Sequence, residues 1–285
     1  MAEPVEARAR RMTIAEALRE AATTLSATSD TARLDAEVLM AHALGVTRSD
    51  LLLRHMAGAV PETFATLVER RQAHEPVAYI TGRQEFFSLP LRVSPAVLIP
   101  RGDSEVLVEA ALAARPGARR VLDCGTGSGA LLLATLSHLP QARGVAIDRC
   151  ARALAVAAGN AAALGLTGRS AFLQRDWTRP GWAAGLGGAD LILANPPYVE
   201  TGTPLAPSVA AHEPHGALFA GADGLDDYRR LLPLLSELLA PGGVACLEIG
   251  YDQAAAVSAL ARAAGLVPQV HQDLNGADRV VEMAA

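Results

Sequence analysis

Hydrophobic residues recur every three or four positions over residues 13–74, which is typical of amphipathic helices. Thr13 and Glu16 have the spacing of a capping box, and Pro61-Glu62 indicates a later helix start. We therefore expect residues 1–76 to form a small bundle of short helices. Two apolar stripes should face its core: Leu18, Ala21, Ala22 and Leu25 in the first, and Leu34, Val38, Leu39, His42 and Ala43 in the second.

After Val77 the apolar positions alternate with polar ones instead. Residues 79–82 and 86–93 show this alternation and are bounded by glycine and proline, which predicts a β-hairpin. We expect this hairpin to form a linker at residues 77–100. A helix should then begin near Asp103 or Ser104, since both are good helix-capping residues.

Short apolar runs alternate with helical segments over residues 119–283. This order is typical of an α/β fold with a parallel, doubly wound sheet, and we expect it to occupy residues 101–285. The predicted parallel strands are residues 121–124, 145–148, 171–173, 189–194 and 244–249. Two late strands, residues 267–272 and 279–283, should close the sheet as an antiparallel pair.

Asn195-Pro196-Pro197-Tyr198 directly follows the predicted strand 189–194. The two prolines exclude helix, so the Asn195 side chain should project from the carboxyl end of a strand, where such sheets bind ligands. The Asn195 oxygen and the Pro196 carbonyl can each accept one hydrogen of a planar NH2 group and align its nitrogen with a methyl donor. Tyr198 would cover the other face of that group. A strand-ending turn without chemistry is the alternative interpretation.

A glycine-rich turn follows the first predicted strand and precedes its helix. Gly125, Gly127 and Gly129 alternate with Thr126 and Ser128, which differs from the dinucleotide-binding GxGxxG spacing, and there is no Walker lysine. Further polar residues follow neighbouring strands: Asp123 for a ligand ammonium group, Asp148 for ribose hydroxyls, and Asp176 with Trp177 for adenine. This set fits S-adenosylmethionine better than NAD. As alternatives, Asp148 could cap the next helix, and Trp177 could serve packing only.

Composition narrows the classes of function. The chain has 285 residues, 51% of them apolar, and a formal charge of −5, with no lysine and no basic stretch. We therefore expect no direct binding of nucleic acid. No run is long enough to cross a membrane, and residues 1–11 do not resemble a signal peptide, so we expect a cytoplasmic protein without membrane contact.

Two further patterns have structural interpretations. Cys124, Cys150 and Cys246 lie in or beside predicted buried strands and have no zinc spacing, so we expect free core thiols. Residues 212–215 read His-Glu-Pro-His, but the proline prevents a helical arrangement of the two histidines. We expect no metal site there, but a loop that folds over the active site. Glu248 should have a structural or supporting role.

These motifs together resemble the protein glutamine N5-methyltransferases, in particular the release factor (PrmC/HemK) family. The resemblance covers nearly the whole chain, and the motif at Asn195 taken alone is shared with DNA adenine methyltransferases. The matching segments are residues 75–82, 85–86, 98–101, 103–105, 123–129, 195–198, 213–214, 217–218, 221–225, 228, 247–250, 273, 276 and 278–279.

The resemblance implies a seven-stranded methyltransferase domain behind a helical substrate-recognition domain. It implies methylation of the glutamine in the Gly-Gly-Gln loop of class 1 release factors, with S-adenosylmethionine as cofactor. Asn195 would contact both cofactor and substrate, and residues 99–101 could border the pocket. The cofactor residues would be Gly125, Thr126, Gly127, Ser128, Gly129, Asp148, Asp176, Trp177 and Asn195, and the residues around the glutamine Asn195, Pro196, Pro197 and Tyr198.

Two residues depart from the family pattern. Gly102 replaces a usual proline, and Ser104 replaces a usual threonine, which leaves the rigidity of this loop open. Asp103-Ser104-Glu105 favours the release factor branch over the sister enzymes that methylate a ribosomal protein. An amino-methyltransferase of DNA or RNA and a cofactor-binding protein without turnover are the remaining alternatives.

Overall fold

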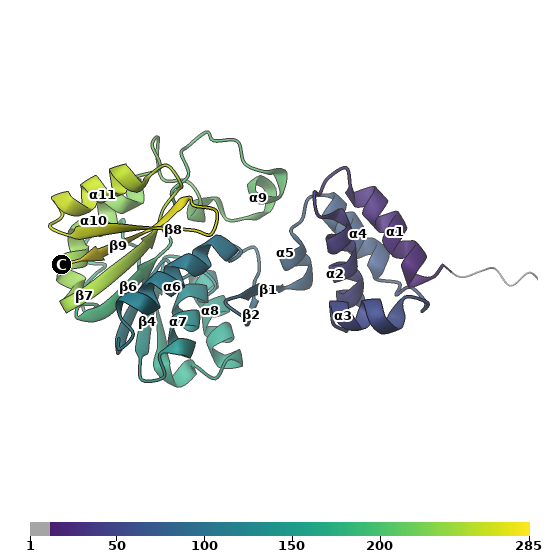
Figure 1. Cartoon of the computed structure of the whole chain (residues 1–285), viewed down its shortest axis with the longest axis horizontal. Coiled ribbons are helices and arrows are strands. Elements are labelled where there is room, and N and C mark those ends of the chain that lie inside the picture. Colours follow the sequence, from purple (N-terminus) through teal and green to yellow (C-terminus); the bar gives the residue numbers. More distant parts are fainter. Residues whose placement is uncertain (1–11) are drawn as a thin grey trace, which may run out of the picture. The chain divides into compact units, whose positions relative to one another are not determined.

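The structure, a computed structural model, describes residues 12–285. The chain divides into two compact units. The first runs to Thr81 and includes Pro207–His212, and the second comprises Gly82–Ala206 and Glu213–Ala285 (Figure 1). Residues 1–11, for which we expected no signal peptide, lie outside the described residues.

The first unit is helical, as the apolar period predicted. The capping box at Thr13 is present, because Thr13 and Glu16 each bind the backbone nitrogen of the other. The unit consists of α1 (Ile14–Leu25), α2 (Ala32–Leu44), α3 (Arg48–Asp50), the π-helical turn η1 (Leu51–His55), α4 (Phe64–Gln72), α5 (Val77–Thr81) and α9 (Pro207–His212).

The prediction of which α2 residues are buried is wrong in part. Leu34 is 44% exposed, whereas Asp35 and Glu37 are buried. Asp35 accepts from Arg71 Nε at 2.7 Å, and Glu37 pairs with Arg48 at 2.7 Å. Burial of a carboxylate is tolerated when a cation neutralises it, and the apolar pattern does not show these distant partners.

The hairpin is shorter than predicted. It consists of β1 (Arg83–Phe86) and β2 (Leu89–Arg92), whereas residues 77–81, which we expected to begin the extended segment, form α5. Phe87 and Ser88 have φ angles of 51° and 62° and make the two-residue turn. Phe86 and Leu91 are fully buried in the core of the second unit, so the hairpin packs on that unit.

The second unit contains a seven-stranded sheet in the order β5-β4-β3-β6-β7-β9-β8. The first five of these are parallel, and β9 is antiparallel to both β7 and β8, so the predicted closing pair is confirmed. The strands are β3 (Arg120–Cys124), β4 (Arg143–Asp148), β5 (Ser170–Gln174), β6 (Ala189–Ala194), β7 (Leu239–Glu248), β8 (Val267–Gln272) and β9 (Asp278–Ala284).

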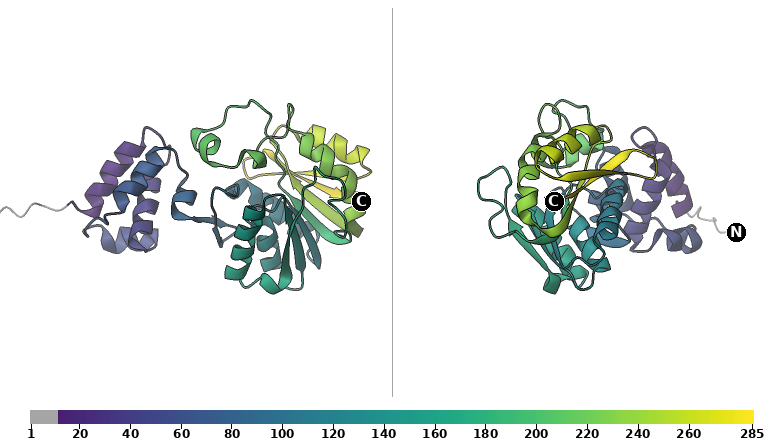
Figure 2. Two further views of the ribbon diagram at one scale, coloured as in Figure 1. Left: turned by 180° about the vertical axis from the view of Figure 1, so that it is seen from behind. Right: turned by 60° about the vertical axis from the view of Figure 1, so that its left-hand side comes forward.

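Helices cover both faces of this sheet (Figure 2). Alternate strand residues point to opposite faces, which gives two apolar layers. One layer contains α6 (Glu105–Ala114), α7 (Ala130–His138) and α8 (Ala151–Ala163), and the other α10 (Asp226–Leu238) and α11 (Ala254–Ala263). Short 3-10 turns are η2 (Gly102–Ser104), η3 (Thr167–Arg169) and η4 (His215–Ala217). None of the helices in residues 12–285 is long and apolar enough to cross a membrane.

Candidate active site

The strand register brings the predicted polar residues into one row. Cys124 on β3 pairs with Ile147 on β4 and with Ala194 on β6, and Ala194 pairs with Leu247 on β7. The residues one position further therefore lie side by side at the carboxyl edge of the sheet: Asp148, Gly125, Asn195 and Glu248.

The glycine turn after β3 depends on left-handed backbone. Gly125, Gly127 and Gly129 have φ angles of 77°, 53° and 86°, which side chains with a Cβ rarely adopt. A Cβ at Gly127 would meet no atom within 4 Å, so the backbone is open to a ligand there. A Cβ at Gly129 would lie 3.2 Å from Cβ of Ala157, so this glycine lets α7 pack closely on α8.

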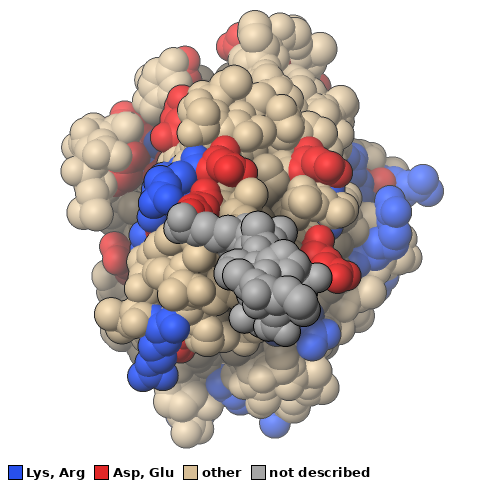
Figure 3. Space-filling view, turned by 90° about the vertical axis from the view of Figure 1, so that its right-hand side faces the viewer, with Lys and Arg blue, Asp and Glu red and all other residues tan. Residues whose placement is uncertain are grey.

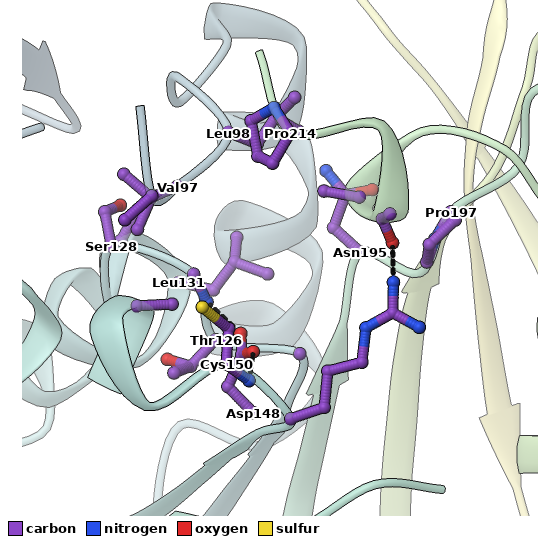
Figure 4. A pocket seen from close by; sticks show the side chains of 18 of the residues that line it. Val97, Leu98, Thr126, Ser128, Leu131, Asp148, Cys150, Asn195, Pro197 and Pro214 are labelled. Carbon is purple, nitrogen blue, oxygen red and sulfur yellow. Dashed lines mark hydrogen bonds between the residues drawn. The ribbon is translucent and has the colours of Figure 1, made fainter. Parts of the chain in front are cut away.

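Asp148 ends β4 and binds two backbone nitrogens. Its Oδ2 accepts from Gly127 N at 3.0 Å, and its Oδ1 accepts from Cys150 N at 2.8 Å (Figure 4). The bond to Cys150 N, just before α8, is of the kind expected if Asp148 caps that helix, which was the alternative interpretation. The bond to Gly127 N ties Asp148 to the glycine turn. The Asp148 carboxylate thus links the end of β4 to the turn that follows β3.

Asp176 and Trp177 lie just after β5 and line the same cavity as the glycine turn. The Asp176 carboxylate accepts from Thr178 N and Thr178 Oγ1, and these bonds lower its pKa. The Trp177 indole nitrogen donates to Asp227 Oδ1 at 2.8 Å. Trp182 is instead buried in the apolar core, so only Trp177 of the two tryptophans lines this cavity.

Asn195 and Pro197 line the cavity, whereas Pro196 and Tyr198 do not. Asn195 Nδ2 donates to Ser104 Oγ at 3.3 Å. Tyr198 is held at both ends, since its hydroxyl donates to Glu248 Oε1 at 3.2 Å and its carbonyl accepts from Gln253 Nε2 at 3.0 Å. Burial raises the Tyr198 pKa, so the phenol stays protonated at neutral pH.

One cavity of about 230 Å³ contains most of the predicted site residues. It brings together Gly125, Thr126, Gly127, Ser128, Asp148, Asp176, Trp177, Asn195 and Pro197, while Gly129, Pro196 and Tyr198 lie outside its lining. The cofactor side and the Asn195 side of the predicted site are therefore parts of one space.

Sequence reasoning missed much of the apolar wall. Val97, Leu98 and Leu131 line the cavity (Figure 4), and a run of ordinary apolar residues gives no signal for this. Cys150 also lines it and is partly exposed, so the prediction of a core thiol is wrong for Cys150. That prediction is confirmed for Cys124 and Cys246, which are buried and free.

Asp123 lies beneath the glycine turn and is fully buried. It was expected near a ligand ammonium group, but it does not line the cavity. Thr126 Oγ1 donates to Asp123 Oδ2 at 2.6 Å. Burial raises the pKa of Asp123 to about 7, and the Thr126 bond opposes that rise.

The segment 213–217 borders the cavity, because Pro214, Gly216 and Ala217 line it. The Glu213 carboxylate is buried and accepts from Ile99 N at 3.2 Å and from the Arg101 guanidinium. Among the described residues, no group of three or more histidine, cysteine, aspartate or glutamate side chains is placed to hold a metal ion. Leu98 and Pro100 line the cavity beside this segment, whereas Ile99 and Arg101 do not.

Comparisons with known proteins match both units of the chain. Residues 16–82 match the family described as PrmC N-terminal domain, and residues 102–212 match the methyltransferase small domain. A release factor glutamine methyltransferase of Moorella thermoacetica is 46% identical, covering 94% of this chain and 97% of that protein. One of Caulobacter vibrioides is 44% identical, covering 88% of this chain and 89% of that protein.

The chain belongs to the release factor glutamine methyltransferase family. It is an S-adenosylmethionine-dependent methyltransferase. The fold agrees with solved methyltransferases. A methyltransferase of Pyrococcus furiosus superposes with a TM-score of 0.52 at 16% identity, covering 70% of this chain and 89% of that chain. An O-methyltransferase family protein of Burkholderia thailandensis gives 0.50 at 15% identity, covering 92% and 97%.

The residues of this methyltransferase fit its cofactor. The open backbone at Gly127 lies beside the Asp148 carboxylate, and Asp148 can accept further hydrogen bonds because a carboxylate has about four acceptor positions. Apolar residues supply most of the remaining wall, as is usual for a cofactor site.

Proposed function

We propose that this enzyme methylates the side-chain amide nitrogen (N5) of the glutamine in the Gly-Gly-Gln motif of class 1 peptide chain release factors. Two relatives that match most of the chain are named release factor glutamine methyltransferases. The observation that carries the proposal is the place of Asn195, which lines the same cavity as the glycine turn and Asp148.

An amide nitrogen is a poor nucleophile, so position and alignment must lower the barrier. The Asn195 oxygen and the Pro196 carbonyl would each accept one hydrogen of the glutamine NH2 group. Within residues 12–285 no hydrogen bond ends on the Pro196 carbonyl, so this oxygen is free to accept one from a substrate. Holding both hydrogens fixes the nitrogen relative to the methyl donor, and such alignment supplies a large part of many rate enhancements.

S-adenosylmethionine supplies an electrophilic methyl group on a sulfonium centre. In our proposal Gly125, Thr126, Gly127, Ser128 and Gly129 form the turn that holds it. Asp148 would accept from the ribose hydroxyls, and Asp176 and Trp177 would contact the adenine. Pro197 would border the glutamine. Tyr198 would cover one face of the glutamine amide, while its bonds to Glu248 and Gln253 hold the motif in place. The helical first unit would recognise the release factor.

Methylation of an adenine amino group in nucleic acid is the rival activity, since adenine presents the same NH2 hydrogens. Such enzymes need cations that grip phosphates. Acidic and basic side chains are interspersed on the face shown in Figure 3. Asp223, Asp226 and Arg229 form a mixed cluster instead of a basic one. Arg149, Arg152 and Arg175 do line the cavity, so the names of the relatives, release factor glutamine methyltransferases, are what favours a protein substrate.

The test is transfer of a radiolabelled methyl group from S-adenosylmethionine to three purified substrates: a class 1 release factor, a ribosomal protein mixture, and DNA. We expect label on the release factor, and none when the glutamine of its Gly-Gly-Gln motif is replaced by alanine. Label on DNA or on a ribosomal protein, with none on the release factor, would contradict the proposal.

A further inference from the structure

The Asn195 side chain has one end engaged by the protein. Its Nδ2 donates to Ser104 Oγ at 3.3 Å, and no other side-chain hydrogen bond of Asn195 is present in the described part of the chain. A carboxamide has a donor end and an acceptor end of nearly the same shape, so its direction is set by its partners. Ser104 therefore decides which end of Asn195 faces the cavity.

Ser104 occupies a helix-capping position without capping the helix. It precedes α6, but its side chain makes no hydrogen bond to that helix, and the residue is 4% exposed. Its hydroxyl oxygen instead accepts from Asn195 Nδ2, and the same hydroxyl lowers the pKa of Glu248. A hydroxyl can donate one hydrogen bond and accept two. If the Ser104 proton points to another group, Ser104 can act toward Asn195 only as an acceptor.

Glu248 is a buried acceptor beside Asn195. It ends β7, next to β6 in the sheet, and is 2% exposed. The Tyr198 hydroxyl donates to its Oε1, and its buried Oε2 has no hydrogen-bond partner among residues 12–285. Burial is the largest influence on Glu248 and raises its pKa above the ordinary value, as does the charge of Asp103. The hydroxyls of Ser104 and Tyr198 and the charge of Arg279 oppose that rise.

Arg279 holds this arrangement together from β9. Its Nη2 lies 3.4 Å from Asp103 Oδ2 and 3.0 Å from Asp273 Oδ2. The first contact ties the turn that carries Ser104 to the sheet. The same guanidinium is a positive charge that favours an ionised Glu248.

We propose that Ser104 and Glu248 are positioning residues that fix the direction of the Asn195 carboxamide. Ser104 gives its proton to the Glu248 carboxylate and must then accept from Asn195 Nδ2. The Asn195 oxygen is thereby directed to the cavity, where it accepts from the substrate NH2. In the reversed direction two NH2 groups would face each other, and the substrate would be repelled. The identity of that substrate rests on the proposed function.

Neutron diffraction from perdeuterated crystals of the whole enzyme tests the direction without any substrate. We expect deuterium on Asn195 Nδ2 toward Ser104, and the Ser104 deuterium toward Glu248. Density that places the Asn195 oxygen toward Ser104 would overturn the proposal. This result is independent of which protein the enzyme methylates, so a failure of the proposed function is recognised separately.

Kinetics with the release factor test the consequence. We expect Ser104→Ala and Glu248→Gln to lower kcat by roughly 10-fold or more, with a smaller change in KM and unchanged affinity for S-adenosylmethionine by calorimetry. Glutamine has nearly the same shape as glutamate, but its amide can donate to Ser104 as well as accept. In Glu248→Gln the direction of the Ser104 hydroxyl, and with it that of Asn195, is therefore no longer fixed.

Two further variants separate positioning from stability. Ser104→Thr keeps the hydroxyl and should restore most of the turnover. Ser258→Ala removes another buried serine, 5% exposed on α11, and should leave kcat unchanged. Wild-type kcat in Ser104→Ala would contradict the proposal, as would equal losses in Ser104→Ala and Ser104→Thr at an unchanged melting temperature.

Discussion

Gly125 lies against the ring of Trp177. A Cβ at Gly125 would be 2.8 Å from Trp177 Cη2, closer than real carbon atoms approach, and the φ angle of Gly125 is 77°. The ring is held in place from α10, because its nitrogen donates to Asp227. The turn after β3 and the segment after β5 are therefore in direct contact at the cofactor site. This contact requires glycine at position 125.

Gly125→Ala should weaken the binding of S-adenosylmethionine by roughly 10-fold or more, because the new methyl group must displace Trp177 or the turn. Isothermal titration calorimetry measures this. The matched control is Gly159→Ala within α8, where a Cβ meets no atom within 4 Å. It should leave binding unchanged and stabilise the enzyme by about 0.5–1 kcal/mol. Equal affinities in the two variants would contradict this role of Gly125.

Asp148→Ala should raise the dissociation constant for S-adenosylmethionine by roughly 10- to 100-fold, since it removes both the proposed ribose acceptor and the bond to Gly127. Asp190→Ala is the control. Asp190 also accepts from two backbone nitrogens, those of Arg119 and Arg120, but near the start of its strand, away from the cavity. It should cost stability without affecting binding. Unchanged affinity in Asp148→Ala would show that the ribose assignment is wrong.

Asn195→Ala should lower turnover by orders of magnitude while leaving the affinity for S-adenosylmethionine largely intact, because it removes an alignment contact to the substrate. Methyl transfer to the release factor and calorimetry measure the two effects. Asn275→Ala in the exposed turn after β8 should leave both unchanged. Near-normal turnover in Asn195→Ala would refute the assigned role.

Stability of the second unit should fall as pH rises from about 4 to about 7, through the contribution of Asp123. Burial raises the pKa of Asp123 to about 7, above its ordinary value of 3.8, so the folded state binds a proton in this range that the unfolded state has released. Asp123→Asn cannot ionise, and its advantage over the wild type should grow by on the order of 4 kcal/mol across that range.

Denaturant unfolding followed by tryptophan fluorescence checks this prediction, since Trp177 and Trp182 both lie in the second unit. The quantity to compare is the difference in unfolding free energy between Asp123→Asn and the wild type at each pH. A difference that stays constant from pH 4 to pH 7 would show that Asp123 is ionised throughout.

Local patterns in the sequence were sufficient to predict the seven-stranded sheet of the second unit. Apolar runs between glycine and proline located the strands of the parallel sheet, and the closing pair after residue 266 was also recognised. Because parallel strands end at one edge of a sheet, the sequence alone predicts that the residues after each strand lie together. Gly125, Asp148 and Asn195 do lie in one row, and they line one cavity.

Only the tertiary structure decided which partners these residues have. Ser104 precedes Asn195 by 91 positions, and Glu248 follows it on another strand, so no local pattern links the three. The same reason explains why Asp35 is buried against Arg71 and why Cys150 lines the cavity. Period and spacing report the neighbours of a residue along the chain, whereas the direction of a side chain and the burial of a charge depend on atoms that folding brings from far away.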